Sequence, residues 1–254
     1  MIIDTHAHYD DEAFNEDRDV VIQKLKEAGI ELVVNVGASM KTSENTIQLT
    51  KEYDFFYGAV GVHPNETHEL NEEKLELLRS YSKLPKIVAI GEIGLDYYWD
   101  EPARDIQKHW FSRQLDLAKE EKLPVIIHSR DAAKDTLDLL SSREYKEVSG
   151  VIHCFSYGVE MAREYLNQEY YLGIGGVVTF NNAKKLKEVV EYAPLDRIVL
   201  ETDCPYLSPV PNRGKRNSSL NLPYVVTQIA TIKNVTEEEV IRVTNQNAKN
   251  LYRL

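Results

Sequence analysis

The chain is poor in cysteine and has no long hydrophobic run. Of its 254 residues only Cys154 and Cys204 are cysteines, and they lie far apart. They do not make a disulfide framework, which favours a reducing compartment. No apolar run approaches the roughly 18 residues of a membrane-spanning helix, and the first residues lack the basic and then apolar character of a secretory signal. We therefore expect a cytoplasmic protein with no membrane partner.

The sequence also lacks an excess of basic residues. Its net charge is −11, with 30 Lys and Arg against 41 Asp and Glu. This excludes a protein that coats nucleic acid through a broad basic face, although a local metal site can still hold a phosphate. No GxGxxG or GxxxxGK[ST] motif follows a predicted strand, so a glycine-rich phosphate loop is absent as well.

What the sequence does have is a regular alternation of two patterns. Short apolar, β-branched runs alternate with segments of helical length, which predicts parallel strands joined by right-handed crossovers. The runs are Ile2–Asp4, Leu32–Val36, Phe56–Val62, Ile87–Ile90, Val125–Ile127, Val151–Ile152, Tyr171–Ile174 and Ile198–Leu200. Eight such units predict an α/β fold, the (β/α)8 TIM barrel, with residues 1–254 as a single domain. An open doubly wound sheet is the alternative.

Helical spacing recurs between these runs and after the last one. The predicted helices are Arg18–Ala28, Glu72–Tyr81, Ile106–Glu121, Ala132–Leu140, Glu160–Leu166, Ala183–Tyr192, Pro223–Lys233 and Glu237–Leu251. Gly29 fits the C-cap of the first helix, and Thr236 with Glu239 predicts a capping box at the last. The segment Ser208–Leu222 is rich in Pro, Asn, Ser and basic residues, which predicts a long loop of the kind that often carries function.

Side chains that can bind metals stand at the C-terminal ends of six of the eight runs. They are His6 with His8, His63, Glu92, His128, His153, and Glu201 with Asp203. In a barrel these ends meet on one face, where active sites lie. Any one of these histidines alone is more typical of a capping or hydrogen-bonded residue, but six such strand ends together indicate a metal site.

Imidazole and carboxylate ligands suit hard to borderline divalent ions such as Mg, Mn, Zn, Co or Ni. Four histidines and two carboxylates exceed the needs of one four-coordinate ion, so we predict two ions about 3.5–4 Å apart with a bridging carboxylate. Glu92 is the expected bridge. The expected ligands of one ion are His6, His8 and Asp203, and those of the other are His128 and His153. Which metal is native stays open.

Several neighbouring residues allow two interpretations. His63 either orients substrate or donates a hydrogen bond to a ligand, or it is a plain loop residue, and Asp203 can also cap the turn that follows it. Glu201 is expected to be structural, paired with an Arg. Asp96, Arg130 and Asp131 are expected to support ligands or to cap helices. Tyr97, Tyr98 and Trp99 are expected to stack on a base or to pack the barrel rim. His68 and His109 are expected to be surface or packing residues.

The motifs that carry these residues resemble one known family over essentially the whole chain. "DTHAHYD", "GVHP", "GEIGLDYY", "LPVIIHSRDA", "IHCFS", "LETDCPYLSP…RGKRN" and "VTNQNAKNLYRL" occur in the order found in the TatD family of metal-dependent deoxyribonucleases, in the amidohydrolase-like barrel superfamily. The resemblance implies a TIM-type barrel, a divalent metal pair, and hydrolysis of DNA from the 3′ end. It assigns ligand roles to His6, His8, Glu92, His128, His153 and Asp203.

Two features depart from the family pattern. Asn65 stands where members often carry a second histidine, and an amide cannot shuttle protons near neutral pH. The stretch "SSLNLPYVV" after "RGKRN" is slightly longer than the common form. Substrate handling is therefore the part of the prediction that these departures affect.

The expected chemistry is attack of a metal-activated water on a DNA phosphate. Glu92 and Asp203 are the predicted catalytic residues, with Asp203 as general base. Arg213, Lys215 and Arg216 are predicted to clamp neighbouring phosphates, unless they only solubilise the loop, and such a compact clamp favours DNA ends or short single strands. The alternatives are hydrolysis of a small amide, lactone or phosphoester, and a metal-binding scaffold without activity. No obligate protein partner is predicted.

Overall fold

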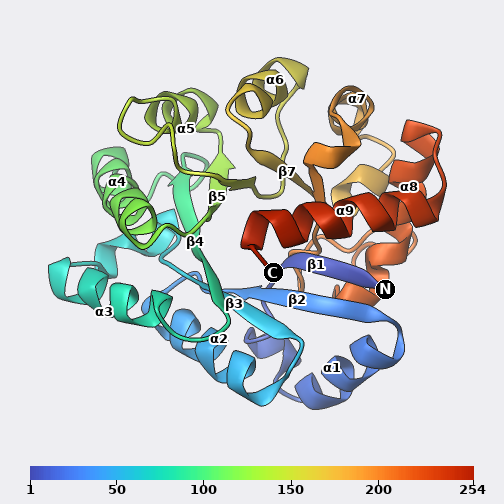
Figure 1. Cartoon of the computed structure of the whole chain (residues 1–254), viewed down its shortest axis with the longest axis horizontal. Coiled ribbons are helices and arrows are strands. Elements are labelled where there is room, and N and C mark those ends of the chain that lie inside the picture. The colour runs from blue at the N-terminus through green and yellow to red at the C-terminus, as the bar shows by residue number, and fades with distance from the viewer.

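The computed structural model describes all 254 residues, Met1–Leu254. Eight parallel strands form one sheet in the order in which they occur along the chain, and helices surround it (Figure 1). The strands are β1 (Ile2–Ala7), β2 (Ile30–Val36), β3 (Phe56–Val60), β4 (Ile87–Asp96), β5 (Val125–Arg130), β6 (Gly150–Ile152), β7 (Tyr171–Ile174) and β8 (Ile198–Leu200). The predicted TIM barrel is therefore confirmed, and the open doubly wound sheet is wrong.

The barrel closes between β1 and β8 without a regular ladder. The backbone contacts there are an isolated bridge between Ala7 and Cys204 and hydrogen bonds such as Asp203 N–H to the His6 carbonyl (3.0 Å). A buried carboxylate spans the same seam. Asp4 accepts hydrogen bonds from the Thr202 hydroxyl (2.7 Å), the Thr202 N–H (3.1 Å) and the Ser219 hydroxyl (2.6 Å). Side-chain hydrogen bonds thus take over part of the role that a ladder plays elsewhere.

Nine α-helices cover the barrel. They are α1 (Arg18–Glu27), α2 (Met40–Glu52), α3 (Glu72–Ser82), α4 (Arg104–Glu121), α5 (Ala133–Leu140), α6 (Val159–Asn167), α7 (Lys184–Tyr192), α8 (Leu222–Lys233) and α9 (Glu237–Tyr252). Eight of them match predicted helices within two residues at each end, and Gly29 follows α1 with a positive φ of 83°. Thr236 caps α9 by accepting from the Glu239 N–H.

The helix α2 was not predicted. Its buried face includes Ser43, Thr46 and Thr50 as well as apolar residues, so hydrophobic spacing, the main sequence signal of a helix, is weak there. Its start is nevertheless well defined. Ser39 and Thr42 form a reciprocal capping box, which satisfies backbone N–H groups that the first turn of a helix leaves free.

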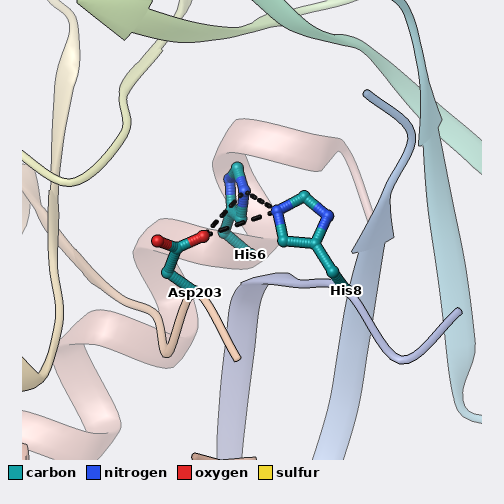
Figure 2. Close-up of side chains that lie close together, drawn as sticks. All are labelled: His6, His8 and Asp203. Atoms are coloured by element: carbon teal, nitrogen blue, oxygen red, sulfur yellow. Dashed lines mark hydrogen bonds and ion pairs between the residues drawn. The ribbon is translucent and has the colours of Figure 1, made fainter. Parts of the chain in front are cut away.

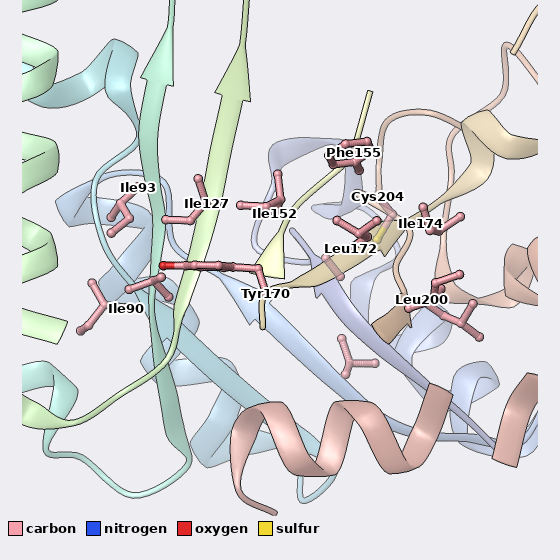
Figure 3. Packing of buried hydrophobic residues seen from close by; sticks show 14 of the residues in the cluster. Ile90, Ile93, Ile127, Ile152, Phe155, Tyr170, Leu172, Ile174, Leu200 and Cys204 are labelled. Carbon is pink, nitrogen blue, oxygen red and sulfur yellow. The ribbon is translucent and has the colours of Figure 1, made fainter. Parts of the chain in front are cut away.

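Alternate strand residues pack into two apolar layers. Val34 and Ile126 belong to a small inner cluster, whereas their neighbours Val33 and Ile127 belong to the larger cluster between strands and helices, part of which Figure 3 shows. The helix α9 crosses one end of the barrel beside both chain termini (Figure 1), and its Tyr252 hydroxyl donates to the Thr5 carbonyl (2.9 Å). The opposite end, where the strands finish, is left for the polar side chains.

None of the helices combines the length and the apolar composition that a membrane span requires.

Candidate metal centre

Residues 6, 8 and 203 converge at the seam between β1 and β8. His6 and His8 bring their Nε2 atoms to 3.0 Å from each other, and Oδ1 of Asp203 lies 3.7 Å from the first and 3.4 Å from the second (Figure 2). Asp203 has a left-handed backbone (φ 55°), uncommon for a residue other than glycine. The three side chains come from segments almost 200 residues apart, and the closure of the barrel is what brings them together.

Glu92, on β4, lies between this group and a second one. Its Oε2 is 3.5 Å from His6 Nε2 and 3.8 Å from His8 Nε2, while its Oε1 is 2.8 Å from His128 Nδ1. The same Oε1 is 3.8 Å from Nε2 of His153. The two oxygens of one buried carboxylate therefore face two different sets of imidazoles, which is the arrangement that a bridging ligand needs.

Backbone groups fix opposite tautomers in His8 and His63. The Nδ1 atom of His8 lies 2.8 Å from the Val36 carbonyl oxygen, which can only accept, so Nδ1 carries the proton and Nε2 of neutral His8 keeps its lone pair. In His63, Nδ1 accepts from the Asn65 N–H (3.2 Å), so Nε2 of the neutral ring carries the proton. His63 Nε2 is 3.9 Å from Glu92 Oε1. Although His63, Glu92 and His128 can be grouped within 4.8 Å, His63 presents an N–H to the site and is suited to donate a hydrogen bond.

Two further carboxylates orient the remaining histidines. Asp96 Oδ2 lies 3.1 Å from His128 Nε2, so both nitrogens of His128 face carboxylates. Glu201 Oε1 lies 3.2 Å from His153 Nδ1 and accepts from the Cys154 N–H at 2.6 Å. The prediction that Glu201 pairs with an Arg was wrong, because its carboxylate lies next to the His153 imidazole instead. Gly173 makes room for the Glu201 side chain, since a Cβ at position 173 would stand 2.2 Å from Glu201 Oε2.

The charges at the site call for a cation. Burial opposes protonation of His8, but the hydrogen bond and charge of Asp203 outweigh it and raise the pKa of His8 to about 9. Burial also opposes protonation of His153, but the charges of Glu201 and Glu92 raise its pKa to about 10. Burial and the nearby His128 lower the pKa of His63 to about 3. A divalent ion can balance the negative charge of these carboxylates while the imidazoles stay neutral, the form in which they bind metals. The donor set therefore fits a metal centre.

Two cavities of contrasting charge open over these donors. The first, of about 490 Å³, is named here the acid-rimmed cavity because Asp10, Asp11 and Glu12 line it and no Lys or Arg does. The second, of about 400 Å³, is the arginine-lined cavity, in which Arg130 is the one Lys or Arg. They share four lining residues, which are His128, His153, Asp203 and Tyr206. The donors are therefore open to solvent from two sides that differ in charge.

The basic residues of the long β8–α8 loop lie away from these cavities. Neither Arg213, Lys215 nor Arg216 lines either one. Arg216 makes a bidentate ion pair with Asp17 (2.8 and 2.6 Å), and Arg213 lies over the Phe180 ring at 4.3 Å from its centroid. In this conformation Arg216 anchors the loop to the segment before α1.

The sequence interpretation missed two charged residues that shape this region. Asp4 is fully buried at the seam, and an acidic residue inside the otherwise apolar start of β1 was the available signal. Arg130 was placed with the capping or supporting residues, whereas its side chain lines a cavity at the donors. His68 and His109 are exposed, as expected.

Comparisons with known proteins agree with the fold and with a metal-dependent enzyme. The family model described as "TatD related DNase" matches residues 3–253. The chain is 46% identical to "Uncharacterized metal-dependent hydrolase YabD" of Bacillus subtilis (strain 168) over the full length of both. It is 34% identical to "3'-5' ssDNA/RNA exonuclease TatD" of Cronobacter turicensis, over 94% of this chain and 93% of that protein.

Among solved structures, the crystal structure of YJJV, a TatD homologue from Escherichia coli K12, superposes with a TM-score of 0.93 at 28% identity. The match covers 100% of this chain and 98% of that one. Fold, donor set and full-length similarity lead to one conclusion: the chain belongs to the TatD-related family and is a metal-dependent hydrolase.

Proposed function

We propose that this hydrolase cleaves phosphodiester bonds of DNA and removes nucleotides from the 3′ end of single strands. The observation that carries the proposal is the position of Glu92, whose two oxygens face separate imidazole sets beneath open cavities. Its similarity to a relative named as a 3′–5′ single-stranded DNA and RNA exonuclease supports the choice of substrate.

We propose two divalent ions, with Glu92 as the shared ligand. His6, His8 and Asp203 would hold one ion together with Glu92 Oε2, since the first three lie within 4.8 Å of one another. His128 and His153 would hold the other together with Glu92 Oε1. When bound, such a pair would polarise the phosphate and lower the pKa of a nearby water.

The chain's own residues then have distinct roles. Asp203, whose Oδ1 faces three imidazoles at 3.4–3.8 Å, is positioned to accept the proton of the attacking water. The N–H of His63 Nε2 is available to a phosphate oxygen. The water oxygen bonds to phosphorus as the bond to the 3′-oxygen of the remaining strand breaks, and that oxygen takes up a proton. The released product is a nucleoside 5′-monophosphate.

The test is cleavage of end-labelled single-stranded DNA by purified protein. Separate reactions would contain Mg²⁺, Mn²⁺, Co²⁺ or Zn²⁺, with EDTA added to one series, and 3′ and 5′ labels would report direction. Glu92→Ala is the inactive variant, and Glu16→Ala, at an exposed acidic residue, is its matched control. Cleavage from the 3′ end that needs metal and Glu92 would support the proposal. If no metal gives cleavage above the Glu92→Ala background, the nuclease proposal fails.

A further inference from the structure

The arginine-lined cavity contains a cation without a counter-charge. Arg130 is the last residue of β5 and is exposed, and its guanidinium forms neither an ion pair nor a hydrogen bond with another side chain. Arg104 and Arg216, by contrast, are paired with Asp100 and Asp17. A free guanidinium in a cavity that also contacts metal-binding side chains is suited to bind an anion, above all a phosphate, through paired N–H groups.

Exposed aromatic rings adjoin this guanidinium. The Arg130 guanidinium carbon lies 3.8 Å from the centroid of the Tyr98 ring, and the Trp99 ring stands perpendicular to Tyr98 at a centroid distance of 5.3 Å. Tyr98 is 56% exposed and Trp99 65% exposed. Such rings offer faces on which nucleic acid bases stack.

The carboxylate of Asp96 connects the aromatic pair to His128. Asp96 Oδ1 accepts the backbone N–H groups of Tyr98 (2.9 Å) and Trp99 (3.1 Å), while its Oδ2 faces His128. The turn that carries the rings is thereby held in a fixed position relative to His128. A strand whose scissile phosphate lies at His128 can therefore meet Arg130 and then the two rings without any rearrangement of the loop.

We propose that Arg130, Tyr98 and Trp99 form a subsite for the nucleotide next to the scissile bond, on the side of the strand that remains. Arg130 binds that nucleotide's phosphate, and its base stacks on the aromatic pair. The inference rests on the proposed function, and it adds the path of the strand, which runs out of the arginine-lined cavity.

The other cavity supports the same direction. Carboxylates of Asp10, Asp11 and Glu12 at its rim repel a further phosphate but can accept a hydrogen bond from a sugar hydroxyl. The acid-rimmed cavity thus suits a terminal nucleoside that ends in a free 3′-hydroxyl, and it disfavours a strand that continues on both sides of the scissile bond. Cleavage from an end follows from this asymmetry.

Two substrates distinguish a role of Arg130 in binding the strand from a role in the hydrolytic step. The p-nitrophenyl ester of thymidine 5′-phosphate carries one nucleoside and no strand, whereas a short oligodeoxynucleotide carries the phosphate and base that the subsite would bind. Arg130→Ala should lower kcat/KM about 10- to 100-fold on the oligonucleotide, as expected for the loss of a charge-assisted phosphate contact, and change it by no more than about twofold on the ester. Arg130→Lys should recover part of the loss, because it restores the charge but not the paired N–H groups.

Arg104→Ala is the matched control, since Arg104 lies over Tyr97 at 4.1 Å in the same loop region but lines neither cavity. It should leave both substrates unaffected. Equal losses on both substrates in Arg130→Ala, or no loss on either, would overturn the subsite. If the unmodified protein cleaves the ester but no oligonucleotide, the proposed function fails and the subsite with it. Thermal unfolding of each variant identifies any that do not fold, in which case Arg130→Gln replaces Arg130→Ala.

Discussion

The two flanks of Glu92 are built differently. On the β1–β8 flank, His6 lies in β1, while His8 follows β1 and Asp203 follows β8. These two strands share no regular ladder, and the Asp4 network spans the seam beside them. On the β4–β5 flank, His128 lies in a paired strand, opposite Gly94, and the ladder continues to Asp96 and Arg130. One half of the centre therefore depends on buried side-chain hydrogen bonds and the other on backbone pairing.

This difference means that single substitutions should act unequally. Removing a polar side chain from the seam leaves buried partners unsatisfied and disturbs both folding and ligand position. Replacing the Asp96 carboxylate on the other flank by an amide leaves the backbone ladder intact. An amide oxygen can still accept from the Tyr98 and Trp99 N–H groups, so the change acts mainly on the orientation of His128. Four substitutions distinguish these effects. The substitution of Glu92, the residue that both flanks share, should be the most severe.

Glu92→Gln should cause the largest loss. An amide cannot supply two anionic oxygens, so both imidazole sets lose their shared partner. We expect kcat/KM on single-stranded DNA to fall at least about 10³-fold, measured with end-labelled substrate at saturating metal. Glu16→Gln serves as the control on the surface. A Glu92→Gln protein with more than a tenth of the original activity would show that the two flanks work independently.

Asp203→Asn should remove the proposed general base on the seam flank. We expect kcat to fall about 10²- to 10³-fold, as measured under single-turnover conditions. Circular dichroism checks that the variant keeps its fold. A fall in metal binding with normal kcat at saturating metal would instead make Asp203 a ligand without a role as base.

Asp4→Ala should reveal how far the seam depends on side chains. The hydroxyls of Thr202 and Ser219 lose their shared acceptor, so we expect the free energy of unfolding to fall by about 2–4 kcal/mol in guanidinium denaturation. Asp4→Asn keeps an acceptor and should lose less. If Asp4→Ala unfolds like the original protein, backbone contacts alone close the barrel.

Asp96→Asn should have the smallest effect on the fold. His128 keeps Glu92 at Nδ1 but loses the carboxylate at Nε2, so we expect metal affinity to weaken about 10- to 100-fold with little change in stability. Calorimetric titration of metal-free protein with Mn²⁺ measures the first, and denaturation the second. A loss of stability as large as that of Asp4→Ala would remove the contrast between the flanks.

The barrel and the side chains that gather at the ends of its strands could be predicted from the sequence, because local patterns of residues indicate both. Apolar runs followed by His or Glu mark strands that end at one face, so His6, Glu92 and His128 stood out before their geometry was known. Partners from distant segments leave no such local signal, and for that reason Glu201 was assigned to an Arg when it faces His153. The helix α2 was missed because much of its buried face is Ser and Thr.

The central claim is that one carboxylate joins two cation sites. Its most direct test is the number of Mn²⁺ ions bound per chain, measured by equilibrium dialysis and elemental analysis of the original protein and of Glu92→Gln. We predict two ions in the original protein and fewer than two in the variant. Full activity with a single bound ion, or a variant that keeps both ions, would contradict the claim.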